Sequence, residues 1–150
     1  RSSDLVYAET GSVKTPKLFA IESFNQVHHM VSEVTATLKD DVNPFAMLLS
    51  ALPGGSITGA PKIRAMEIID EVEPVKRGIF GGAVGYLGWH GEMDMSIAIR
   101  TCVIRENKVY VQAGAGLVYD SNPESEWNET QIKARAVIKA VELSSNGLIL

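Results

Sequence analysis

The sequence contains a single cysteine, Cys102, among its 150 residues. One thiol excludes an internal disulfide and any zinc site built on several cysteines, and it is what a reducing cytoplasm permits. The sequence also lacks a run of about 18 apolar residues that would cross a bilayer. Its first ten residues lack the charged-then-apolar order of a secretory signal. These absences predict a cytoplasmic protein that does not act on a membrane.

Positive charge is scarce as well. The sequence has 14 Lys and Arg residues and 18 Asp and Glu residues, which gives a net charge of −4. No block of five or more like charges occurs. No broad basic surface is therefore available, so we expect no nucleic acid as a partner. The hydrophobic share of 45% is ordinary for a soluble globular protein and allows one domain with a real core.

Capping residues predict three helices. Asn43 followed by proline favours a short helix over residues 44–52, whose apolar sequence FAMLLSAL predicts that it is largely buried. A proline at the first turn and apolar spacing predict a second helix over residues 61–73. Asn122, again followed by proline, can cap a last helix that runs to about Leu143.

A further helix is expected over residues 24–38, because apolar residues recur there at helical spacing after Ser23, a suitable cap. This segment carries His28 and His29. Neighbouring side chains on a helix point about 100° apart, so at most one of the two histidines faces a given site. His29 is the candidate, although a helical histidine can equally be structural.

The middle of the chain changes to a period of two. Residues 79–89 and 93–104 predict two strands joined by a turn, and residues 109–116 predict a third strand after the turn RENK. Together they form an antiparallel sheet meander. With the packed helices, this predicts an α+β (mixed α/β) fold.

The last helix carries an acidic stripe. Glu126, Glu129 and Lys133 are spaced by three and four residues, so they share a narrow arc of the helix surface. Two carboxylates one turn apart are hard oxygen ligands suited to Mg²⁺. An ordinary solvated face with a Glu–Lys pair has the same spacing. A separate apolar stripe lies about 100° around the helix from the acidic stripe and is expected to be the buried face. It consists of Trp127, Ala134, Ile138 and Val141.

The loop GGSITGAPK has some features of a phosphate-binding loop. Gly54 and Gly59 have the required spacing, but residues 60–61 are Ala and Pro where that motif needs lysine and a hydroxyl residue. A nucleotide site is therefore not expected. A glycine-bearing turn with two hydroxyls, Ser56 and Thr58, remains at a helix start and could hold a carboxylate, or it is a simple loop.

The sequence QAGAG at residues 112–116 ends a predicted strand. Its two glycines let backbone donors approach a ligand without side chains in the way, although a tight turn has the same composition. Arg100 is the one basic residue of the strand predicted over residues 93–104, and its planar guanidinium fork matches a carboxylate. An internal salt bridge is the alternative for Arg100.

Five segments taken in order resemble the C-terminal blocks of the chorismate-binding enzyme family. They are VHHMVS, PGGSITGAPKIRAMEIIDEVEP, RGIFGGAVGYLGWHGEMDMSIAIRT, VQAGAGLVYDS and EWNETQIKARAV. The resemblance extends from about Gly11 to about Val141. It implies an anthranilate synthase-like chorismate-binding fold of antiparallel sheets with helices outside, of which residues 1–150 are the C-terminal portion, with chorismate and Mg²⁺ in a cleft.

The resemblance also implies a role for each candidate residue. Glu129 is expected to be a metal ligand, with Glu126 as a second carboxylate of the shell. Lys133 would orient the acidic pair, and His29 would lie near the departing ring hydroxyl. The other expected substrate contacts are Ser56 and Thr58 at the ring, Phe80, and, at the substrate carboxylates, Arg100, Gly114, Ala115 and Gly116.

Within the family, PGGSITGAPK and VHH favour amination of chorismate to 4-amino-4-deoxychorismate for p-aminobenzoate and folate. YVQAGAG, ESEWNET and KARAV favour the alternative, anthranilate formation for tryptophan. Phe80 stands where many anthranilate synthases have a tyrosine, which counts slightly against that alternative. In either case ammonia is expected from a glutamine amidotransferase subunit or domain. A non-catalytic interaction module with a degenerate site is a third possibility.

The family's remaining metal ligand and sheet strands are expected upstream of these residues. The sequence therefore predicts a portion of a longer protein. On its own, the portion is expected to be inactive and to expose an apolar sheet face that promotes self-association.

Overall fold

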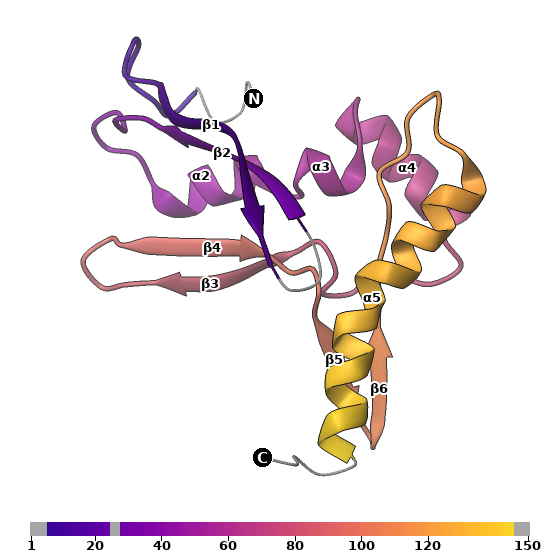
Figure 1. Ribbon diagram of the computed structural model, residues 1–150. Coiled ribbons are helices and arrows are strands. Elements are labelled where there is room, and N and C mark those ends of the chain that lie inside the picture. Colours follow the sequence, from indigo (N-terminus) through magenta and orange to yellow (C-terminus); the bar gives the residue numbers. More distant parts are fainter. Residues whose placement is uncertain (1–5, 25–27, 146–150) are drawn as a thin grey trace. The chain divides into compact units, whose positions relative to one another are not determined.

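The computed structural model describes residues 6–24 and 28–145. The chain divides into two compact units, Arg1–Leu52 and Pro53–Leu150. The first unit contains β1 (Lys14–Ser23), β2 (His28–Thr35) and α2 (Pro44–Ala51). The second contains α3 (Gly55–Thr58), α4 (Lys62–Val72), β3 (Ala83–Leu87), β4 (Met93–Ile97), β5 (Cys102–Arg105), β6 (Lys108–Val111) and α5 (Pro123–Ser145) (Figure 1).

The first unit is built on an antiparallel hairpin of β1 and β2, with Ala20 opposite Val31 and Ser23 opposite His28. The helix predicted over residues 24–38 is therefore wrong for its described part, and residues 25–27 lie outside the described residues. Two causes explain the error. Valine and threonine are frequent in this segment and favour extended backbone, and its pairing partner β1 lies in a segment that had no assigned structure.

Helix α2 is confirmed, together with its cap. The Asn43 side chain accepts hydrogen bonds from the backbone amides of Phe45 (2.9 Å) and Ala46 (3.2 Å), and Pro44 is the first helical residue. The prediction that this helix is largely buried is wrong for the chain as it stands. Phe45 is 59% exposed and Leu49 is 70% exposed, so its apolar side chains remain open to solvent.

The second unit contains two hairpins, β3 with β4 and β5 with β6, both antiparallel. Both predicted turns are confirmed. The continuous middle strand of the predicted meander is wrong, because the chain breaks between β4 and β5. There Arg100 has a φ of 55°, and the Ile99 amide donates to the Ile97 carbonyl oxygen at 2.8 Å, which marks a tight turn. Positive φ at a non-glycine residue is uncommon and departs from the extended backbone of a regular strand. Among the described residues, the strands thus form three two-stranded sheets.

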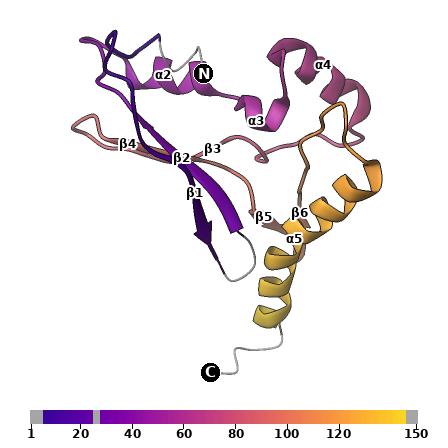
Figure 2. The same ribbon diagram turned by 45° about the horizontal axis from the view of Figure 1, so that its top comes forward.

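Helix α5 lies beside the β5–β6 hairpin in both views of the molecule (Figure 1, Figure 2). Its predicted cap is confirmed, because the Asn122 side chain accepts from the amides of Glu124 and Ser125, each at 3.1 Å. The helices and antiparallel hairpins together confirm the α+β class. None of the described helices is long and apolar enough to span a bilayer.

Burial is sparse throughout the described residues. Ala8 and Ala98, each 6% exposed, are the only buried apolar side chains among them, and no large side chain of the described part is fully buried. The β1–β2 hairpin carries open apolar groups, including Phe19 at 67% and Ile21 at 74% exposed. These surfaces exceed the scattered apolar exposure of an ordinary monomer and mark contact faces.

Candidate functional site

Two members of the acidic stripe of α5, Glu126 and Lys133, are half-buried, whereas Glu129 is exposed. The half-buried positions of α5 recur every three or four residues and are Glu126, Thr130, Lys133, Ala134, Val137 and Val141. Trp127 and Ile138, which were expected on the buried face, are 65% and 45% exposed. The half-buried face of α5 is therefore centred nearer to Glu126 than the predicted apolar stripe is. The side of α5 that packs against the hairpin is not its most apolar side.

Lys133 connects the acidic stripe to the QAGAG segment. Its ammonium group donates a hydrogen bond to the Gly114 carbonyl oxygen at 3.1 Å and forms an ion pair with the Glu129 carboxylate one helix turn away. The Lys133 side chain is 28% exposed, whereas that of Glu129 is 49% exposed. One ammonium group thus holds a carboxylate beside a glycine-rich backbone, which brings together three of the residues selected from the sequence.

Phe80 lies against the same segment. A Cβ placed on Gly114 would meet the Phe80 ring at 3.6 Å, which is ordinary contact, while one on Gly116 would meet nothing within 4 Å. The backbone at Gly116 is therefore open on the side where a ligand could approach. Phe80, Gly114, Lys133 and Glu129 form a continuous series of contacts, here called the α5 cluster.

The two hydroxyls of the GGSITGA turn differ in their hydrogen bonding. The turn contains the single helical turn α3, where a loop was expected. The Thr58 hydroxyl donates to the Gly54 carbonyl oxygen at 3.2 Å, so this hydroxyl is already engaged. Ser56 is exposed, and its hydroxyl makes no hydrogen bond with another described residue. Ser56 is thus the hydroxyl of the pair that is available to a ligand.

Arg100 is exposed in the break between β4 and β5. Its guanidinium forms no ion pair with any other residue in the described part of the chain, so the internal salt bridge considered above is not found there. An exposed fork is available to a carboxylate. No hydrogen bond or ion pair joins the Arg100 side chain to the α5 cluster among the described residues.

His29 belongs to the first unit, whereas all other candidate residues belong to the second. It lies on β2 opposite Glu22 and is exposed. Its ring packs edge-on against Phe24, with the ring centroids 5.8 Å apart. Because successive side chains of a strand alternate between faces, His28 and His29 point to opposite sides of the hairpin, which differs from the 100° expected on a helix.

The donor set on α5 fits magnesium in kind. No group of three or more His, Cys, Asp or Glu residues that could hold a metal occurs in the described ranges. Mg²⁺ needs no such cage, since it is usually held by one or two carboxylates and completes its shell with water and substrate. Glu126 and Glu129, one turn apart with only oxygen donors, supply what such a half-open shell requires.

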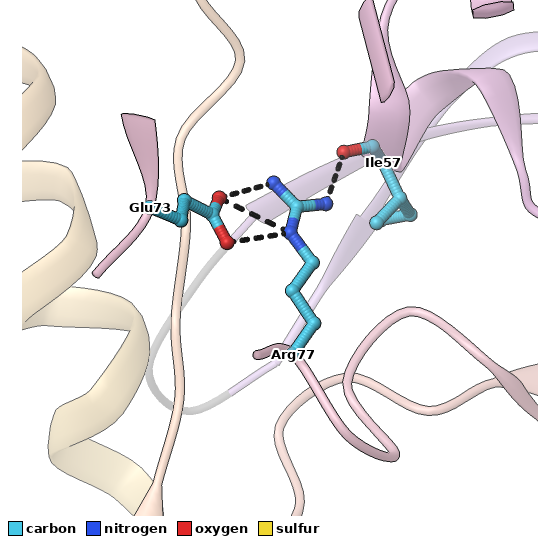
Figure 3. A network of polar contacts seen from close by, with 3 residues as sticks. All are labelled: Ile57, Glu73 and Arg77. Atoms are coloured by element: carbon cyan, nitrogen blue, oxygen red, sulfur yellow. Dashed lines mark hydrogen bonds and ion pairs between the residues drawn. The ribbon is translucent and has the colours of Figure 1, made fainter. Parts of the chain in front are cut away.

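One further group of polar contacts, which the sequence did not predict, joins α3 to the chain that follows α4. Arg77, just beyond α4, forms a fork with the Glu73 carboxylate and also donates to the carbonyl oxygen of Ile57 on α3 (Figure 3). The signal available in the sequence was the spacing of Glu73 and Arg77, four residues apart. That spacing also occurs in many ordinary helix pairs, and it carried no information about Ile57.

Comparison with known proteins identifies the family of the chain. The sequence profile of the chorismate binding enzymes matches residues 3–139. Anthranilate synthase component 1 of Acinetobacter calcoaceticus is 73% identical over 143 residues, which cover 95% of this chain and 29% of that protein. The chain therefore spans less than a third of the length of this curated relative.

Two solved structures are similar. Anthranilate synthase component I from Streptococcus pneumoniae superposes with a TM-score of 0.84 at 43% identity, covering 91% of this chain and 31% of that one. A putative 2,3-dihydroxybenzoate-specific isochorismate synthase from Bacillus anthracis superposes with a TM-score of 0.86 at 28% identity, covering 95% and 38%. The expected anthranilate synthase-like fold is confirmed, and the chain belongs to the family of chorismate binding enzymes.

Proposed function

We propose that the protein carrying this chain acts as component 1 of an anthranilate synthase, which converts chorismate and ammonia to anthranilate with release of pyruvate and water. The similar proteins from Acinetobacter and Streptococcus that bear this name support the proposal. The sequence motifs placed 4-amino-4-deoxychorismate formation first and anthranilate formation second. The relatives favour the second reaction, and we adopt it.

One geometric observation carries the assignment of the site. Lys133 holds the Glu129 carboxylate next to the Gly114 backbone, where a substrate carboxylate would be received. Chorismate bears two carboxylates, and acidic side chains facing them would repel the substrate unless a cation lay between. The α5 cluster is therefore suited to a dianionic substrate accompanied by a divalent cation.

In this proposal Glu129 and Glu126 hold Mg²⁺. When bound, the ion supplies charge neutralisation and acts as a Lewis acid and template for the substrate carboxylate. Lys133 keeps the Glu129 carboxylate oriented toward the site. Arg100 offers its guanidinium fork to a substrate carboxylate, and the open backbone of residues 114–116 donates N–H groups to it.

The remaining roles concern the ring. His29 would donate a proton to the departing hydroxyl, a task suited to a group whose ordinary pKa lies near neutrality. Ser56 would contact the ring, and the engaged Thr58 hydroxyl would shape the turn around it. Phe80 provides an apolar wall without the hydroxyl that a tyrosine would add. Ammonia would come from a glutamine amidotransferase component.

The test of the proposed function uses the full-length protein with chorismate, Mg²⁺ and ammonium, its products being separated chromatographically while fluorescence is recorded. We expect directly formed fluorescent anthranilate. An amino-deoxychorismate product that becomes p-aminobenzoate only after a lyase is added would establish the other reaction. No consumption of chorismate would indicate a non-catalytic module.

A further inference from the structure

We propose that Arg77 is a positioning residue that holds α3 and the Phe80 wall in place before chorismate arrives. The inference rests on the proposed function and extends it, because Arg77 itself belongs to none of the expected ligand contacts. It acts through Ile57 and Phe80, which lie beside Ser56 and Gly114 respectively.

The Arg77 guanidinium contacts Glu73, Ile57 and Phe80. Its Nε lies 3.1 and 3.0 Å from the two Glu73 carboxylate oxygens, and its Nη2 lies 2.5 Å from one of them. Its Nη1 donates to the Ile57 carbonyl oxygen at 2.9 Å (Figure 3). Its face lies over the Phe80 ring, 5.7 Å from the centroid. A planar fork can make these contacts together, and a lysine ammonium cannot.

The contact with Ile57 matters because α3 has little stability of its own. It consists of four residues, and its N-cap residue, Gly54, offers no side-chain cap. A single helical turn does not persist in water without tertiary contacts. The Ile57 side chain packs against Gly81, where an added Cβ would approach it to 2.6 Å. The carbonyl oxygen held by Arg77 and the side chain on Gly81 thus fix the same residue from two directions.

The contact with Phe80 extends the effect to the α5 cluster. The Phe80 ring lies beside Gly114, whose carbonyl oxygen accepts the hydrogen bond from Lys133. Arg77 is therefore linked by successive contacts both to the Ser56 turn and to the acidic stripe. The Arg77 and Glu73 side chains are 23% and 31% exposed, so the pair is partly shielded from solvent and is stronger than a surface pair.

Arg64 is a natural control in the same segment. It also pairs with two carboxylates, Glu67 at 2.9 Å and Glu71 at 3.1 Å, and these partners raise the pKa of its guanidinium. Its side chain is 56% exposed, and all three residues lie on α4 itself. Removal of Arg64 therefore deletes an arginine with two ion pairs without releasing another element.

The experiment compares R77K and R64Q in the full-length enzyme. For R77K we expect the KM for chorismate to rise about tenfold while kcat stays within about threefold, because saturating substrate can still order the site. We also expect faster hydrogen exchange in a peptide covering residues 54–59 without chorismate. R64Q should match the wild type in both measurements.

The variant E73Q/R77Q separates positioning from charge balance. If Arg77 serves only to neutralise Glu73, this neutral pair restores the KM and the slow exchange. We expect both to remain altered, because the Ile57 carbonyl oxygen has lost its donor. Wild-type values in R77K, or rescue by the double variant, would overturn the inference. Failure of the wild type to form anthranilate would overturn the proposed function alone, since the exchange comparison needs no turnover.

Discussion

Replacing Glu129 with glutamine is expected to lower kcat/KM for chorismate by roughly a thousandfold at fixed Mg²⁺. The amide is a poorer ligand and removes one negative charge from the proposed metal shell. A bound ion contributes several kcal/mol of charge stabilisation, and each 1.36 kcal/mol corresponds to a factor of ten in rate. The measurement is steady-state kinetics of the full-length enzyme over a range of Mg²⁺ concentrations, where the variant should need far more metal.

Glu124→Gln is the matched control. Glu124 lies in the first turn of the same helix, is exposed, and loses the same charge on substitution. It should retain wild-type activity, whereas Glu126→Gln should fall by roughly 10- to 100-fold if it acts through a water molecule. The Glu129–Lys133 pair is partly exposed and stabilises the fold by only about 0.5 kcal/mol. Equal activity of the Glu129 and Glu124 variants, with unchanged melting, would rule out a metal role for Glu129.

The 150-residue chain produced alone is expected to show no turnover of chorismate and to self-associate. Its described residues leave large apolar side chains open on both units, among them Met30, Leu49 and Ile63, each at least 70% exposed. Such surfaces associate in water unless another part of the protein covers them. Size-exclusion chromatography with light scattering, alongside the chorismate assay, measures both properties.

The full-length protein provides the comparison for this experiment. There the same faces should be covered, so the protein should bind far less of a hydrophobic dye per chain than the isolated segment does. A monomeric isolated segment with measurable anthranilate formation would show that the segment is sufficient. That result would contradict our assignment of essential groups to the rest of the longer protein.

Local chemistry made the helices predictable. Asn43 and Asn122 were identified as caps because an asparagine before proline satisfies the first amides of a helix, and both side chains make those bonds. These interactions span two or three residues, so one sequence window contains them. The two turns between residues 83 and 111 were predictable for the same reason.

The β1–β2 hairpin could not be inferred in the same way. The spacing of apolar residues after Ser23 fits a helix, and the deciding factor was the partner strand, Lys14–Ser23, whose own pattern is not periodic. The break at Arg100 was equally hidden, because it depends on the positive φ of Arg100 and on the tight turn between the Ile99 amide and the Ile97 carbonyl oxygen. Pairing between separate segments overrides local preference in such cases.

For the candidate site, the sequence identified the stripe on α5 but not its surroundings. The spacing of Glu129 and Lys133 predicts their ion pair, while the bond from Lys133 to Gly114 joins residues 19 positions apart and needs the fold. Arg77 was overlooked for the same reason, since its bond to Ile57 spans 20 positions. Residue types indicated the chemistry, and tertiary contacts determined which of them meet.

The most direct test of the proposed site is the location of the metal. Crystals of the full-length protein grown with chorismate and Mn²⁺, a hard ion that accepts the same oxygen ligands, would be measured at the manganese absorption edge. We predict an anomalous peak about 2.1 Å from a carboxylate oxygen of Glu129, with Glu126 bound directly or through a water molecule. A peak at other residues, with both carboxylates turned away from the metal and the substrate, would contradict the assignment.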